Sequence, residues 1–146
     1  MTFEKLLEKL GESLGVEIEN AGGAAAVDVD GTTVVLQDAD GFLLMRAVVG
    51  ELPQEKKAAI LASAMEANFL YQGTGGATLA VNPSDGMLHI HKYDWMERFD
   101  AGEVLEKIGK LADTVAGWRK ILADCDLDEG DAGESPVDLQ GQSLRV

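Results

Sequence analysis

The residues best suited to metal binding or proton transfer near neutral pH are two histidines, His89 and His91. They are two positions apart in an alternating apolar segment that predicts a strand, so both side chains project from the same strand face. A zinc site needs further ligands, and no cysteine or acidic residue stands at an informative spacing from this pair. We therefore predict no metal site and interpret both histidines as ordinary strand residues.

Three short segments resemble fragments of ion-binding loops. Residues 28–31 and 38–41 both have the pattern Asp-x-Asp-Gly, but neither opens the longer loop with a terminal glutamate that calcium sites use. Gly73-Thr74-Gly75-Gly76 follows an expected helix and precedes an expected strand, the reverse of the order in a phosphate-binding loop. We predict turns at all three places and no cofactor.

Nucleophilic catalysis has equally weak support in this sequence. None of the serines lies in the strand–turn–helix context that exposes a catalytic serine. Cys125 is surrounded by acidic residues, which disfavour the thiolate and weaken the sulfur as a nucleophile. No catalytic residues are predicted, and we expect a protein that is not an enzyme.

The charge of the chain limits its partners. The 146 residues include 26 acids and 12 bases, so the formal net charge is −14. Such a surface repels nucleic acid and anionic membranes, and it either favours cationic partners or simply maintains solubility. The single cysteine excludes an internal disulfide, and no long apolar run is present. We expect a soluble cytoplasmic protein without a signal peptide or membrane span.

The first half of the chain predicts one helix and three strands. Large apolar residues recur on one stripe of a helix at 3–14, which begins after Thr2. That stripe either packs on the protein's own sheet or lines a groove for a partner. Strands are expected at 25–29, 32–37 and 42–49, with turns at Asp30-Gly31 and over 38–41. Because the third strand is almost wholly apolar, we expect it to be central and covered on both faces.

The second half predicts helix, hairpin and helix. A helix at 53–71 is apolar on nearly all sides, and Gly73 is expected to end it in the left-handed conformation. One protomer cannot cover all sides of such a helix, which favours a homodimer. A hairpin is expected at 77–81 and 87–93, and a long amphipathic helix begins after Asp100 with a capping box. We predict one domain at 1–123 and a disordered acidic tail at 124–146.

This order of elements resembles the class I type III secretion chaperones of the Tir-chaperone (CesT-like) family over residues 3–123. The resemblance implies an α+β fold, α-β-β-β-α-β-β-α, with a twisted, mostly antiparallel sheet and helices packed on it. The acidic tail is not part of the family pattern. The resemblance is carried by the leucine-rich opening helix, Gly50-Glu51-Leu52-Pro53, Glu66-Ala67-Asn68-Phe69, Thr74-Gly75-Gly76-Ala77-Thr78-Leu79-Ala80-Val81 and Trp118.

The resemblance also implies a function: a bacterial cytoplasmic homodimer that binds the N-terminal segment of a secreted effector and keeps it soluble without ATP. By matching positions, the client would contact the first helix and the adjacent strands at Phe3, Leu6, Leu7, Leu10, Val27, Val29, Val34 and Leu36. The second helix and the following strand would form the dimer interface with Ile60, Leu61, Met65, Asn68, Phe69, Leu79 and Val81. The alternative is a non-enzymatic regulatory or scaffold protein on the same fold that binds another folded protein.

Overall fold

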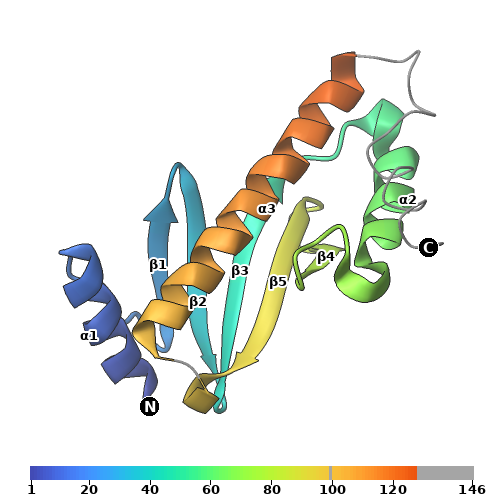
Figure 1. The fold of residues 1–146 in the computed structure, drawn as a ribbon. Helices are drawn as coiled ribbons and strands as arrows, with labels where there is room; N and C mark the ends of the chain where they lie inside the picture. The colour runs from blue at the N-terminus through green and yellow to red at the C-terminus, as the bar shows by residue number, and fades with distance from the viewer. Residues whose placement is uncertain (99, 128–146) are drawn as a thin grey trace. The chain divides into compact units, whose positions relative to one another are not determined.

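The computed structural model describes the backbone of residues 1–98 and 100–127 and the side chains of these ranges up to Asp124. The observed order of elements confirms the predicted α+β arrangement (Figure 1). Short 3-10 turns lie at Gln54–Lys56, Phe69–Tyr71 and Met96–Arg98. The helices and strands are α1 (Phe3–Leu14), β1 (Ala24–Val29), β2 (Thr32–Ala39), β3 (Phe42–Gly50), α2 (Lys57–Asn68), β4 (Thr78–Val81), β5 (Leu88–Trp95) and α3 (Ala101–Leu127).

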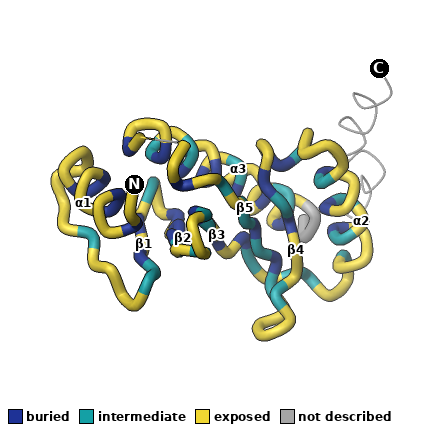
Figure 2. The backbone as a smooth tube through the Cα atoms, turned by 90° about the horizontal axis from the view of Figure 1, so that it is seen from below, coloured by how far each residue is buried: buried dark blue, intermediate teal, exposed yellow. Residues whose placement is uncertain are grey.

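The strands form one five-stranded sheet in the order β1-β2-β3-β5-β4, and β2 pairs antiparallel with both of its neighbours. Strand β3 is central, as predicted, but its burial alternates along the strand (Figure 2). Leu43 and Met45 are buried, whereas Arg46 and Val48 are exposed. The prediction that β3 is covered on both faces is therefore wrong: successive side chains point to opposite faces, and the protomer buries only one of them.

The chain divides into two units, residues 1–47 with 91–113 and residues 48–90 with the segment from 114 onward, which we describe separately. In the first unit, the Thr2 hydroxyl accepts a hydrogen bond from the Lys5 N–H at 3.2 Å and caps α1. Gly15 ends the helix in the left-handed conformation, with φ 68°. Both ends of this helix agree with the sequence prediction.

Two further local predictions concern the first unit. Ala39 pairs with Phe42, so β2 extends beyond its predicted end and the second turn consists of Asp40 and Gly41 alone. The capping box at the start of α3 is confirmed. The Glu103 N–H donates to Asp100 Oδ1 at 2.9 Å, and the Asp100 N–H donates to Glu103 Oε2 at 2.9 Å.

In the second unit, α2 ends at Asn68, and the chain reverses at Leu70 and Tyr71, which have φ of 53° and 57°. The prediction that Gly73 ends this helix in the left-handed conformation is wrong, since Gly73 is absent from the residues with positive φ. Its carbonyl instead accepts a hydrogen bond from the Trp118 indole N–H at 2.9 Å. Because this hydrogen bond comes from a residue 45 positions away, tertiary structure stabilises the turn.

Helix α3 carries the predicted stripe of buried apolar residues and extends to Leu127. The domain boundary predicted at 123 therefore lies within a helix. Residues 128–146 of the predicted tail lie outside the described residues, so the disorder of the tail stays a prediction. The buried members of the stripe are Val104, Ile108, Leu111, Val115, Trp118 and Leu122.

Candidate binding surfaces

The structure places the predicted client-binding residues in the core of the first unit. Folding buries the apolar stripe of α1 and the inward side chains of β1 and β2 in this protomer. Client binding at these positions therefore stays a prediction, which the burial of the side chains in this protomer does not favour. Phe3, Leu6, Leu7, Leu10, Val27, Val34 and Leu36 are each at most 6% exposed, and Val29 is half-buried.

The opposite face of the sheet in this unit carries apolar and aromatic side chains that remain accessible. We call this group, Val35, Phe42, Leu44, Tyr93 and Trp95, the open sheet face. Tyr93 and Trp95 are 56% and 49% exposed, and the other three residues are half-buried. Such a group of accessible apolar side chains is typical of a surface that binds another molecule.

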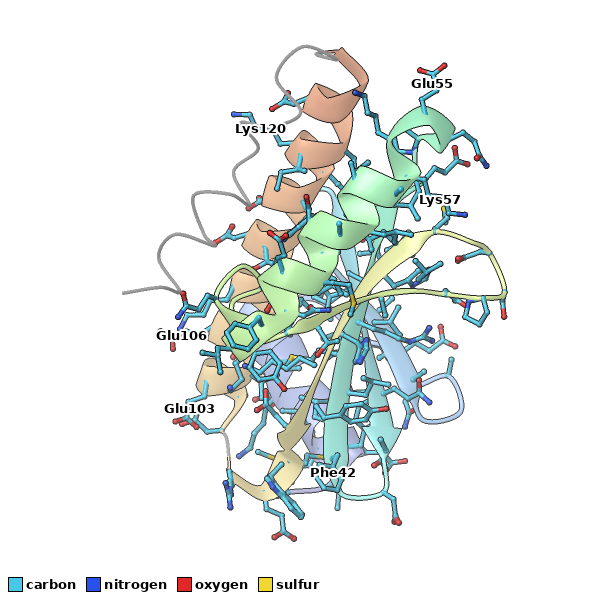
Figure 3. All side chains as sticks on the ribbon, turned by 90° about the vertical axis from the view of Figure 1, so that its right-hand side faces the viewer. Phe42, Glu55, Lys57, Glu103, Glu106 and Lys120 are labelled. Atoms are coloured by element: carbon cyan, nitrogen blue, oxygen red, sulfur yellow. The ribbon has the colours of Figure 1, made fainter. Side chains whose placement is uncertain are left out.

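A ring contact and the strand register relate members of the open sheet face to one another. The rings of Phe42 on β3 and Trp95 on β5 lie 4.1 Å apart between centroids, at an interplanar angle of 36°. Val35 pairs with Arg46, which shares a strand face with Phe42 and Leu44. The Arg98 guanidinium lies 5.8 Å from the centroid of Trp95, a cation–π distance. Figure 3 shows Phe42 at the lower end of β3.

Strand β1 is an edge of the sheet, and its outer backbone groups can be assigned from the register. The Asp38 N–H donates to the Gly23 carbonyl at 2.9 Å, so these residues form a hydrogen-bonded pair and the bonding alternates from there. Ala26 and Asp28 therefore direct their N–H and C=O groups away from β2. Within the described ranges, no backbone hydrogen bond reaches them from that side. An extended segment can pair with this edge.

A second accessible surface lies on α2 and the turn that follows it, in the second unit. We call it the α2 patch: Met65, Phe69, Leu70 and Tyr71, which are 72%, 59%, 66% and 54% exposed. Leu70 and Tyr71 adopt a left-handed backbone that costs energy for residues other than glycine. This turn therefore keeps large apolar side chains in water although its backbone is unfavourable.

The predicted dimer residues separate into different roles in this protomer. Met65 and Phe69 are exposed, Val81 is 37% exposed and Leu61 is half-buried. Ile60 and Leu79 are at most 4% exposed and belong to the core. Leu70 and Tyr71, which Gln72 separates from the glycine-rich turn, are exposed beside Phe69 but are not among the predicted dimer residues.

Asn68 has a structural role that its position on α2 did not indicate. Its amide Nδ2 donates to the Leu79 carbonyl at 2.9 Å, and the Leu79 N–H donates to its Oδ1 at 2.8 Å. Leu79 lies on β4, the other edge of the sheet, so the side chain of Asn68 takes the place of a neighbouring strand. This arrangement holds β4 against α2 within one protomer.

Replacing Asn68 with alanine is expected to lower the free energy of unfolding by about 2–4 kcal/mol, because two hydrogen bonds are lost and both backbone groups of Leu79 lose their partner. Asn68→Asp keeps the acceptor for the Leu79 N–H but sets a carboxylate oxygen against the Leu79 carbonyl oxygen, so we expect a loss at least as large with that variant. Urea unfolding at several protein concentrations measures both. A loss that appears only at low concentration would assign Asn68 to the dimer contact instead.

The titratable groups of β5 and its hairpin have local partners. His89 Nε2 lies 2.8 Å from Asp85 Oδ2. The pKa of the Asp85 carboxyl is lowered by the hydrogen bond from the Met87 N–H and, less strongly, by His89. Burial lowers the pKa of Lys92, despite the opposing attraction of Asp94 at 3.8 Å. Within the described residues, no three His, Cys, Asp or Glu side chains are grouped so as to hold a metal ion.

Comparisons with known proteins agree with the fold. Residues 5–119 match the Tir chaperone protein (CesT) family. A comparison with curated protein sequences finds no match. Among the helices that the structure describes, none is both long and apolar enough to cross a membrane.

Several solved structures share the fold at low sequence identity. The HopA1–SchA chaperone–effector complex has a TM-score of 0.67 and 18% identity, with 81% of this chain and 93% of that chain covered. The ExsC–ExsE complex has a TM-score of 0.68 and 15% identity, with 81% and 91% covered. The heterodimeric ExoU–SpcU complex from the type III secretion system of Pseudomonas aeruginosa has a TM-score of 0.60 and 14% identity, with 83% and 94% covered.

Proposed function

Because the chain belongs to the Tir chaperone protein (CesT) family, we propose that it is a cytoplasmic bacterial chaperone for a type III secreted effector. The observation that carries this proposal is the open sheet face, which exposes aromatic side chains in the same unit as an unpaired strand edge. The similar complexes named for a chaperone with its effector, or for a type III secretion system, also support it.

The client we propose is the N-terminal segment of the effector in an extended conformation. Its backbone can form hydrogen bonds with Ala26 and Asp28 on the edge of β1. Its apolar side chains can pack on the open sheet face, where each large side chain removed from water contributes roughly 1.5–3 kcal/mol. Ordering the client offsets part of this gain. Apolar client residues that are covered in this way can no longer drive aggregation of the client.

The dimer we propose forms through the α2 patch. Four large apolar side chains are exposed there within one turn of helix and the residues that follow it. A second copy covering them would remove the apolar surface from water and leave the acidic exterior in contact with solvent. Binding by surface contacts alone requires no ATP, metal or catalytic group, so we propose a chaperone that is not an enzyme.

The proposal can be tested by deleting the gene in its own bacterium and comparing the secreted proteins by mass spectrometry. We expect loss of at least one effector from the medium. The purified chaperone should then bind that effector's N-terminal segment, and not its folded remainder, in calorimetric titration without nucleotide. Unchanged secretion combined with binding to a folded partner would instead support a regulatory or scaffold protein.

A further inference from the structure

Arg46 places a positive charge among the apolar side chains of the open sheet face. It lies on β3 two positions after Leu44, so both side chains project from the same face of the strand. Its partner on β2 is Val35, which is half-buried. The Arg46 side chain is exposed, and its guanidinium forms no hydrogen bond or ion pair with the residues that the structure describes. Its donors are therefore available to a bound molecule.

His91 on β5 lies beside Arg46 on the same face. Strand β3 begins at Phe42 and β5 ends at Trp95, and the rings of these two residues are in contact, so the neighbouring strands run antiparallel (Figure 1). Equal steps along both strands from this contact place Arg46 opposite His91. The His91 ring packs edge-on against Tyr93, with 6.2 Å between centroids. An arginine and a histidine thus occupy adjacent positions.

The charge of the open sheet face differs from that of the whole chain. Within residues 32–47 and 91–95, no acidic side chain occupies an outward position on β2, β3 or β5. The chain as a whole contains 26 acids and 12 bases. On the edge strand β1, the outward carboxylate of Asp28 accepts a hydrogen bond from the Thr33 hydroxyl at 2.6 Å. The Arg98 guanidinium adds a second positive charge beside this face. Its local potential therefore favours an anionic group.

We propose that the open sheet face selects client segments with an aspartate or glutamate between large apolar residues, and that Arg46 binds this carboxylate. A client packed on the face removes water from the guanidinium, which is unfavourable unless an anion pairs with it. A carboxylate can accept two parallel hydrogen bonds from the guanidinium, and a His91 N–H can donate to the same group. The existence of a client rests on the proposed function, whereas the preference for a carboxylate rests on Arg46 and its surroundings.

The test uses the full-length protein and synthetic peptides of about ten residues, in which leucine alternates with serine and the central residue is glutamate, glutamine or lysine. Fluorescence anisotropy measures their affinities. We expect the glutamate peptide to bind at least tenfold more tightly than the glutamine peptide, and high salt to reduce this difference. Arg46→Gln should abolish the difference. Lys9→Gln, which removes an equal charge from an exposed position on α1, should leave it unchanged.

Charge reversal at Arg46 extends the test. Arg46→Glu should bind the lysine peptide at least tenfold more tightly than the glutamate peptide. Circular dichroism should show folded variants, because Arg46 is exposed. A glutamate peptide that fails to bind, or that keeps its advantage over the glutamine peptide in Arg46→Gln, would overturn the inference. Loss of self-association in Arg46→Glu would also overturn it, since a second copy would then cover the face. An effector segment that still binds the unmodified protein would leave the chaperone function standing.

Discussion

Replacing Met65 with aspartate is expected to convert the proposed dimer to a monomer at micromolar concentration. Met65 is 72% exposed in the protomer, so a carboxylate there is well tolerated before association. In a dimer formed through the α2 patch, the same carboxylate would be buried without a partner, at a cost of several kcal/mol. Every 1.4 kcal/mol weakens association about tenfold, and a symmetric interface contains the change twice.

Sedimentation measures this change, and urea unfolding shows whether the protomer remains intact. Ile60→Asp is the matched control on the same helix, because Ile60 is 1% exposed and contributes to the protomer core. We expect that variant to unfold rather than dissociate. An unmodified protein that sediments near 15.5 kDa would disprove the homodimer, and a Met65→Asp protein that remains dimeric would exclude the α2 patch as the interface.

Replacing Trp95 with alanine is expected to weaken binding of the effector's N-terminal segment by about 10- to 100-fold. Trp95 is 49% exposed and is held by contact with Phe42, so it can present a large ring to a client without being reordered. Tryptophan is among the residues that most often dominate the energy of an interface. Because about half of the side chain is exposed, we expect little loss of protomer stability compared with a core substitution.

Leu10→Ala is the matched control for this experiment. Leu10 was predicted to contact the client, but it is 0% exposed and lies in the core. We expect this variant to lose about 2–5 kcal/mol of stability while its folded form retains client affinity. Calorimetric titration below the unfolding transition compares the two variants. If Leu10→Ala loses affinity and Trp95→Ala does not, then the client site lies on the α1 stripe as first predicted.

Elements whose ends depend on neighbouring residues could be predicted from the amino-acid sequence. Thr2 and Gly15 delimit α1 through hydrogen bonds and a backbone conformation that involve only a few adjacent positions. The Asp100–Glu103 capping box and the Asp30-Gly31 turn formed as predicted for the same reason. The family resemblance could also be recognised from the sequence, because it depends on the order of elements and on the residues around the glycine-rich turn.

Tertiary structure decided which apolar residues are core and which are surface. The alternating pattern showed that each strand has two faces but did not show which face is buried. Val35 and Leu36 are adjacent and both apolar. Only the position of the covering helices buries Leu36 and leaves Val35 half-buried. Because of the same limit, most of the predicted client contacts fall at positions that the protomer buries. The role of Asn68 could not be predicted from the sequence either, because its two hydrogen bonds are formed with Leu79, which is eleven positions away.

The reversal after α2 was also decided by long-range contacts. Glycine is the usual residue for a left-handed backbone, which favoured Gly73 on local grounds. In the folded unit, Trp118 binds the carbonyl of Gly73, and Thr74 is 1% exposed, so the reversal falls on Leu70 and Tyr71. A left-handed backbone costs of order 1–3 kcal/mol at each residue other than glycine, so contacts elsewhere in the fold must offset this cost at Leu70 and Tyr71.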